Sequence, residues 1–303
     1  MSEQMAAPAS ISGSLRAGDG WRLAVCWMLV GVWGACLVVT SVWPVAAMAS
    51  AAEDLKALAF LLCVALHASL SYRWLGTGAF FVIVYVVAFV FEALSIATGF
   101  PFGFYEHGPS FGMQVLRVPL MVPLVYVLLG WFAWTLACII VRERPTQRGG
   151  ATRVVTPLAA AFILTGFDFV YDPIGSAALG LWVYRDPSGY FGVPLTNFLG
   201  WLLTSWVAFQ LFALVEERFI RTAGVERIGY WLLPCVIWTA IALQYPFLYA
   251  RASAGTVTVG GGTFVISDIY EAAVAAGLLT MLFVSLVAVS RLLVAREHRA
   301  GPV

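Results

Sequence analysis

The fold class is decided by residues 118–144, whose sequence is VPLMVPLVYVLLGWFAWTLACIIVRER. Residues 118–141 carry no charge, and Arg142, Glu143 and Arg144 follow directly. A helix needs about 20 consecutive apolar residues to cross the hydrocarbon core of a bilayer. The segment therefore predicts a transmembrane helix that ends at a charged interface.

Similar apolar runs recur on both sides of this segment. The chain is 61% hydrophobic and only 11% charged, with a mean hydropathy of +0.90, whereas soluble domains carry about 25% charged residues. This composition excludes a soluble enzyme and a disordered chain, and the net charge of +1 offers no basic surface to nucleic acid. It predicts an all-α, polytopic membrane bundle. We predict eight spans, at residues 23–43, 55–72, 77–98, 118–141, 153–172, 192–215, 229–250 and 267–290.

Basic residues divide unevenly between the two sides of this predicted bundle. Thirteen of the 17 Lys and Arg residues fall on the side that holds both termini. The positive-inside rule therefore predicts cytoplasmic termini in a cell inner membrane. We expect a flexible polar tail over residues 1–20, one transmembrane domain over 21–295 and a short tail over 296–303. The basic loop 142–153 is interpreted as a topology determinant near anionic headgroups, with a partner site as the alternative.

Several acidic residues lie within or at the ends of the predicted spans. An ionised side chain at the centre of a bilayer costs roughly 2.5–3.5 kcal/mol on insertion scales, so such residues are functional candidates that face the bundle interior. In the predicted topology they all lie toward the non-cytoplasmic side, together with Asn197. The alternative is that they cap helix ends or pair with Arg117 or Arg185. The acids are Glu92, Asp168, Asp172, Asp268 and Glu271.

The spacing of these acids adds chemical detail. Asp168 and Asp172 are four residues apart and share one face of a helix. Two carboxyl groups so placed and partly dehydrated cannot both ionise cheaply, so we expect one to keep its proton near neutral pH and to serve as a general acid. Pro173 predicts that the helix ends there. Two further pairs or stripes share a helix face: Asp268 with Glu271, and Asn197 with Trp201 and Ser205.

Metal ligands and nucleotide motifs are missing from the sequence. The three histidines, His67, His107 and His298, are scattered, and the five cysteines lie in apolar runs without CxxC spacing. This pattern argues against di-iron, haem and zinc sites, so we expect neither a metal nor a cofactor. His67 is interpreted as a core residue, whereas Glu106 and His107 are secondary site candidates.

Two loops rich in glycine, proline and aromatic residues fall on the same side as the acids. Their sequences are TGFPFGFYEH at residues 98–107 and DPSGYFGVPLTN at residues 186–197. Glycine permits tight turns, proline fixes them, and aromatic rings supply rigid faces. Anchoring at the membrane interface would explain the aromatic residues but not the ordered Gly-Pro pattern.

Four sequence blocks resemble, in order, those of the CruF-type carotenoid biosynthesis proteins, and the resemblance covers roughly residues 55–290. Members of this family are integral membrane carotenoid 1,2-hydratases, and one branch contains the bisanhydrobacterioruberin hydratases. They add water across the terminal C1=C2 double bond of an acyclic ψ end, as in γ-carotene, lycopene or a C50 relative. The blocks are FEALSIATGFPFGFY at 91–105, VPLMVP at 118–123, DFVYDP at 168–173 and GYFGVPLTNFLGW at 189–201.

The resemblance implies an acyclic or monocyclic carotenoid as the substrate and the lipid bilayer as the surroundings. Other enzymes of carotenoid biosynthesis are candidate partners. The matching polar positions are Glu92, Tyr105, Asp168, Asp172 and Asn197. We expect catalysis by Glu92, Asp168 and Asp172. We expect positioning of substrate or water by Tyr105, Tyr190, Asn197, Trp201, Asp268 and Glu271.

Hydration of an isolated alkene makes specific demands on such a site. Protonation at C2 gives a tertiary cation at C1, which water then captures. The reaction needs a carboxylic acid donor, a nearby acceptor that activates water, and π-faces that stabilise the cation. The paired acids and abundant aromatic residues of this chain meet those needs.

Two other functions are compatible with parts of the pattern. An intramembrane prenyltransferase is suggested by Asp168-x-x-x-Asp172, which has the spacing of a magnesium-diphosphate motif, but a second such motif and a cluster of cations are missing. A proton-coupled carrier or binding protein for a lipophilic molecule would also use buried acids, but no two-fold repeat of spans is visible.

Overall fold

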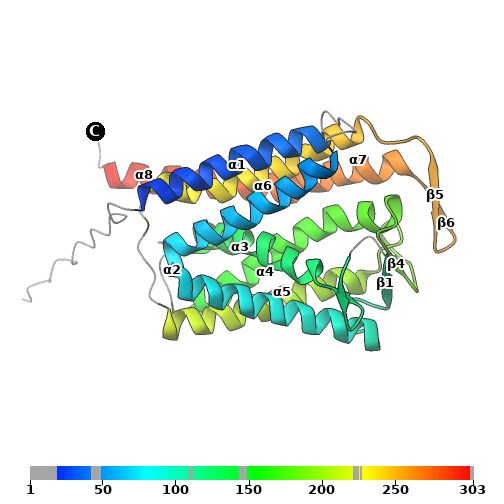
Figure 1. The fold of residues 1–303 in the computed structure, drawn as a ribbon, viewed down its shortest axis with the longest axis horizontal. Helices are drawn as coiled ribbons and strands as arrows, with labels where there is room; N and C mark the ends of the chain where they lie inside the picture. The colour runs from blue at the N-terminus through cyan, green and yellow to red at the C-terminus, as the bar shows by residue number, and fades with distance from the viewer. Residues whose placement is uncertain are drawn as a thin grey trace, which may run out of the picture.

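The computed structural model describes residues 19–41, 49–108, 112–142, 149–220, 225 and 227–300. Residues 1–18 of the predicted tail and 143–148 of the predicted basic loop lie outside these ranges. The long helices lie side by side in one bundle (Figure 1). Its helices are α1 (Gly20–Ser41), α2 (Ala49–Thr98), α3 (Met121–Val141), α4 (Thr152–Pro173), α5 (Leu195–Phe219), α6 (Ile228–Tyr249), α7 (Ile266–Gly277) and α8 (Phe283–Ala300), with π-helical turns η3 (Ile174–Ala178) and η4 (Leu278–Leu282).

Seven helical segments of the described residues are long and apolar enough to cross a membrane. One of them, α2, has 50 residues and would be about 75 Å long if it were straight, far more than one bilayer crossing requires. Its backbone leaves the helical region at Arg73, where φ is 55° and ψ is 178°. Figure 1 shows the two halves of α2 running in opposite directions. The halves supply two crossings, so the predicted all-α membrane bundle is confirmed and the break accounts for the eighth span.

The boundaries of three predicted elements differ from the observed ones. α3 begins at Met121 because residues 118–119 form a short strand. The predicted helix end at Asp172-Pro173 is wrong: α4 includes Pro173, and the π-helical turn η3 continues the helix by five residues to Ala178. At the C-terminus, α8 continues to Ala300, so the predicted tail from residue 296 is helical up to that point.

Short strands connect the helices at one end of the bundle. They pair as three antiparallel two-stranded ladders: β1 (Tyr105–His107) with β4 (Trp182–Tyr184), β2 (Gln114–Val115) with β3 (Val118–Pro119), and β5 (Thr256–Val259) with β6 (Gly262–Val265). In the first ladder Tyr105 lies opposite Tyr184 and His107 opposite Trp182. α1 begins and α8 ends at the other end of the bundle (Figure 1).

A buried ion pair ties three helices together at the end where α1 begins. Arg142 is the residue directly after α3. Its guanidinium lies 2.9 Å from the Glu216 carboxylate of α5, and both side chains are buried. The Tyr72 hydroxyl of α2 donates to the same carboxylate at 2.5 Å, and the Trp134 indole donates to Tyr72 at 3.1 Å. Each buried charge is therefore matched by an opposite charge or a hydrogen bond.

We predict that Glu216→Ala destabilises the bundle by about 3–5 kcal/mol, because it leaves the buried Arg142 charge without its carboxylate. Glu217→Ala is the matched control, since Glu217 forms an exposed pair with Arg153 at 3.1 Å, and such pairs contribute about 0–1 kcal/mol. Thermal unfolding in detergent measures both variants. Equal losses of stability in the two would contradict the assignment.

Candidate active site

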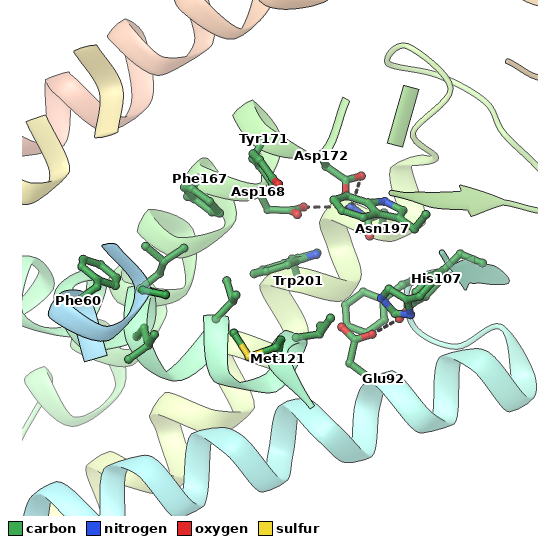
Figure 2. A pocket seen from close by; sticks show the side chains of 18 of the residues that line it. Phe60, Glu92, His107, Met121, Phe167, Asp168, Tyr171, Asp172, Asn197 and Trp201 are labelled. Carbon is green, nitrogen blue, oxygen red and sulfur yellow. Dashed lines mark hydrogen bonds between the residues drawn. The ribbon is translucent and has the colours of Figure 1, made fainter. Parts of the chain in front are cut away.

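A cavity of about 370 Å³ lies between α2, α3, α4 and α5, beneath the β1–β4 ladder (Figure 2). Its lining is polar on one side and mainly aromatic or aliphatic on the other. The polar side includes three carboxyl groups, those of Glu92, Asp168 and Asp172, each no more than 3% exposed. These acids come from spans that are far apart in the sequence, so the fold brings them together.

An asparagine joins two of these carboxyl groups. Asp168 and Asp172 project from one face of α4, as their spacing predicts. Pro194 is extended and α5 begins directly after it, which places Asn197 in the first turn of α5. The Asn197 side-chain amide donates to Asp168 Oδ2 at 3.0 Å and to Asp172 Oδ2 at 3.1 Å. The two aspartates are therefore held by one donor group.

The β1–β4 ladder forms a roof over the carboxyl groups. Side chains alternate along a strand, so every second residue faces the same way. Tyr105 donates to Glu92, and Tyr184 donates to Asp172 Oδ2 at 2.7 Å. Burial raises the pKa of the Tyr105 and Tyr184 hydroxyl groups well above the ordinary range, so both remain donors. The roof residues that line the cavity are Tyr105, His107, Trp182 and Tyr184, whereas Glu106 and Val183 are exposed.

The other walls of the cavity are mainly aromatic and aliphatic, with Glu53 and Lys56 of α2 also in the lining. Trp201 lines it and stacks on the buried Tyr126, with ring centroids 4.0 Å apart and planes 13° from parallel. Phe60 and Phe167 face the same space from α2 and α4 (Figure 2). The lining also includes Met121, which is 49% exposed, so the cavity reaches the outer surface of the bundle. Such a site can hold an apolar group against buried acids.

Six predicted site residues line this cavity: Glu92, Tyr105, Asp168, Asp172, Asn197 and Trp201. Three others lie elsewhere. Asp268 and Glu271 are exposed on α7, and Glu271 accepts a long hydrogen bond of 3.5 Å from Tyr249. Tyr190 stacks on Phe169 at 4.7 Å and is not part of the lining. The expected convergence therefore holds for the acids of α2 and α4 but not for those of α7.

Ion pairing does not explain the buried aspartates. Arg117 pairs with Glu106 at 3.0 Å, and the Arg185 guanidinium lies 4.3 Å from the centre of the Phe104 ring. Within the described part of the chain, neither Asp168 nor Asp172 makes an ion pair. In the same ranges, no group of three or more His, Cys, Asp or Glu side chains is placed to hold a metal ion.

The sequence reading missed Trp182 and Tyr184. Their only signal was the alternation of aromatic and aliphatic residues in Trp182-Val-Tyr184, in the loop that follows the predicted span 153–172. His67 lies in the core, as predicted, where it contacts the Tyr230 carbonyl at 2.9 Å and accepts from the Trp131 indole at 3.0 Å.

His107, in strand β1, makes the stability of the folded protein depend on pH. Burial lowers its pKa from 6.5 to about 4. As pH falls from 6.5 toward 4, the unfolded chain binds a proton at this position and the folded chain does not, so stability is lost across that window. We predict that His107→Gln reduces this loss in thermal unfolding experiments while the curves agree above pH 6.5. Curves with the same slope below pH 6.5 would contradict the prediction.

Comparison with known proteins identifies the family. The sequence profile of the family described as "Carotenoid biosynthesis protein" matches residues 52–266. The bisanhydrobacterioruberin hydratase of Haloarcula japonica is 32% identical over 137 residues, which make up 45% of this chain and 43% of that protein, so the match spans less than half of the relative. No solved structure matches the chain. With the family profile covering well over half of its length, the chain belongs to the carotenoid biosynthesis protein family.

Proposed function

We propose that this protein is a carotenoid hydratase that adds water across the terminal C1=C2 double bond of an acyclic carotenoid end and leaves a tertiary alcohol at C1. The observation that carries the proposal is the group of three buried carboxyl groups at one side of a cavity whose other walls are mainly apolar, with Glu53 and Lys56 also in the lining. Hydration of an alkene needs both an acid and a base in such surroundings. The name of the haloarchaeal relative, a hydratase, supports the same reaction class.

The proposed reaction uses the residues that line the cavity. A carboxyl group of the Asp168/Asp172 pair donates its proton to C2, and the tertiary cation forms at C1 beside the Trp201 ring. Glu92 accepts a proton from the water that attacks C1. Tyr105 orients Glu92 through its hydrogen bond, and Asn197 fixes the aspartate pair. No step calls for a metal or a redox cofactor.

The size and position of the cavity support lateral entry of the substrate. A volume of about 370 Å³ is at the lower end of the usual range for small-molecule sites and suits an end group better than a whole polyene. Exposed residues of α2 and α3, Ala57 and Met121, belong to the lining. The substrate would pass from the bilayer at this edge, and the remainder of the polyene would stay in the lipid.

Orientation in the membrane is a further part of the proposal. We infer that both termini are cytoplasmic in a cell inner membrane, from the excess of basic residues on that side. The start of α1 and the end of α8 lie at the same end of the bundle, which supports an even number of crossings (Figure 1). The cavity would then face the non-cytoplasmic side.

We predict that expression in a host that makes lycopene or γ-carotene yields a more polar pigment that is heavier by one water. Growth in oxygen-18 water should label the new hydroxyl group, and oxygen-18 gas should not. Label from the gas would indicate an oxygenase. A pigment profile that stays unchanged with several ψ-end substrates would favour a carrier or binding protein instead.

We predict that reporter domains fused after residues 110, 180 and 258 are non-cytoplasmic, whereas fusions after residues 147 and 222 are cytoplasmic. The physical reason is the retention of arginine-rich loops on the cytoplasmic side. Protease protection in intact cells measures each fusion. The reverse pattern at two or more positions would overturn the proposed orientation and the placement of the site with it.

A further inference from the structure

The two aspartates of α4 have very different numbers of hydrogen-bond donors. Asp172 accepts from the Tyr184 hydroxyl at 2.7 Å and from the Asn197 amide at 3.1 Å, and the Trp182 side chain interacts with the same carboxyl group. Asp168 accepts from the Asn197 amide alone among the described residues, at 3.0 Å. A carboxylate is stabilised by each donor that points to it, whereas a protonated carboxyl group uses one oxygen as a donor itself.

The backbone of this region is built to bring two of those donors to Asp172. The π-helical turn η3 follows α4 directly and leads into β4, where Trp182 and Tyr184 are two residues apart and face the cavity. Gly175 within η3 leaves room for the Trp182 ring, since a Cβ at this position would lie 2.1 Å from it. π-helical turns are rare and often occur at functional sites. The turn, the glycine and the strand thus act together on one carboxyl group.

We propose that Trp182 and Tyr184 are positioning residues that hold Asp172 as the carboxylate and thereby make Asp168 the proton donor of the site. This inference rests on the proposed hydration and goes beyond it, because it separates the roles of the two aspartates. The indole and phenol groups are neutral and donate only hydrogen bonds, so they fix the charge on Asp172 without an added cation. Asp168, with one donor, keeps the proton that the pair shares.

In the proposed cycle, Asp168 gives up its proton and is protonated again at the end. The O–H bond of Asp168 breaks as a C–H bond forms at C2 of the substrate. The Asp172 carboxylate faces the resulting cation and stabilises it electrostatically. Water forms the new C–O bond at C1 and loses a proton to Glu92. Transfer of that proton from Glu92 back to Asp168 restores the starting state, so the net change is the addition of one water.

A double-mutant cycle between Tyr184→Phe and Asp172→Asn tests the inference, with product formation measured in membranes that contain equal amounts of each variant. We expect Tyr184→Phe to slow hydration about tenfold, because it removes one hydrogen bond to a charged group. In the Asp172→Asn background the same change should have less than about a twofold effect, since Tyr184 acts through Asp172. Val183→Ala, on the exposed face of β4, is the matched control and should be unchanged.

Single variants test the assignment of the acid. Asp168→Asn should form no product, whereas Asp172→Asn should form product slowly, because Asp168 is still present. Gly175→Ala should slow hydration by displacing Trp182 while every polar group of the site remains. If Asp172→Asn does not accumulate in the membrane, Asp172→Ser takes its place.

The outcomes separate this inference from the proposed function. Absence of product from the unmodified protein would overturn the hydratase proposal together with this inference. Normal hydration by the unmodified protein, combined with equal effects of Tyr184→Phe in both backgrounds, would overturn only the positioning role. Product from Asp168→Asn, or none from an accumulated Asp172 variant, would overturn the assignment of Asp168 as the donor.

Discussion

The burial of carboxyl groups inside an apolar bundle is the constraint on which the rest of this structure depends. Each buried acid needs a partner, and the protein supplies two different kinds. Glu216, near the end where α1 begins, is matched by the Arg142 guanidinium and serves packing. The three buried acids at the polar side of the cavity accept hydrogen bonds from hydroxyl and amide groups, which are neutral donors and leave a carboxyl group able to hold a proton. The second group lines the cavity described above, and this placement makes its acids the ones available for chemistry.

Much of the fold follows from the sequence because transmembrane helices obey a simple length rule. Uninterrupted apolar runs bounded by charges placed each predicted span on an observed helix, although several of these helices extend beyond the predicted ends. The acids of α2 and α4 were predicted to meet because ionisable residues are expensive in a bilayer and must find one another. The same argument failed for Asp268 and Glu271. They lie in the first turns of α7, where the helix is exposed, so no burial cost forces them inward.

The remainder of the site depends on features that a pattern of apolar residues does not encode. Trp182 and Tyr184 reach Asp172 only because a π-helical turn follows α4 and because β4 pairs with β1 over a separation of more than 70 residues. Neither the π-helical turn nor the strand pairing has a strong local signature in the sequence. Proline after Asp172 even suggested that the helix would end there. The break at Arg73, in contrast, lies in the gap between the predicted spans 55–72 and 77–98, although helical structure continues on both sides of it. Long-range pairing and local backbone irregularities thus decide which donors meet which acid.

The central claim is that a buried carboxyl group protonates the terminal double bond and that water then captures the cation. Turnover in deuterium oxide tests this claim most directly. Protonation by the site should leave one deuterium at C2 of the alcohol. In Glu92→Gln, recovered substrate should carry deuterium at C2 or at the adjacent methyl groups, because the cation forms but is not captured. An alcohol with only hydrogen at C2 would contradict protonation by the site and with it the whole account.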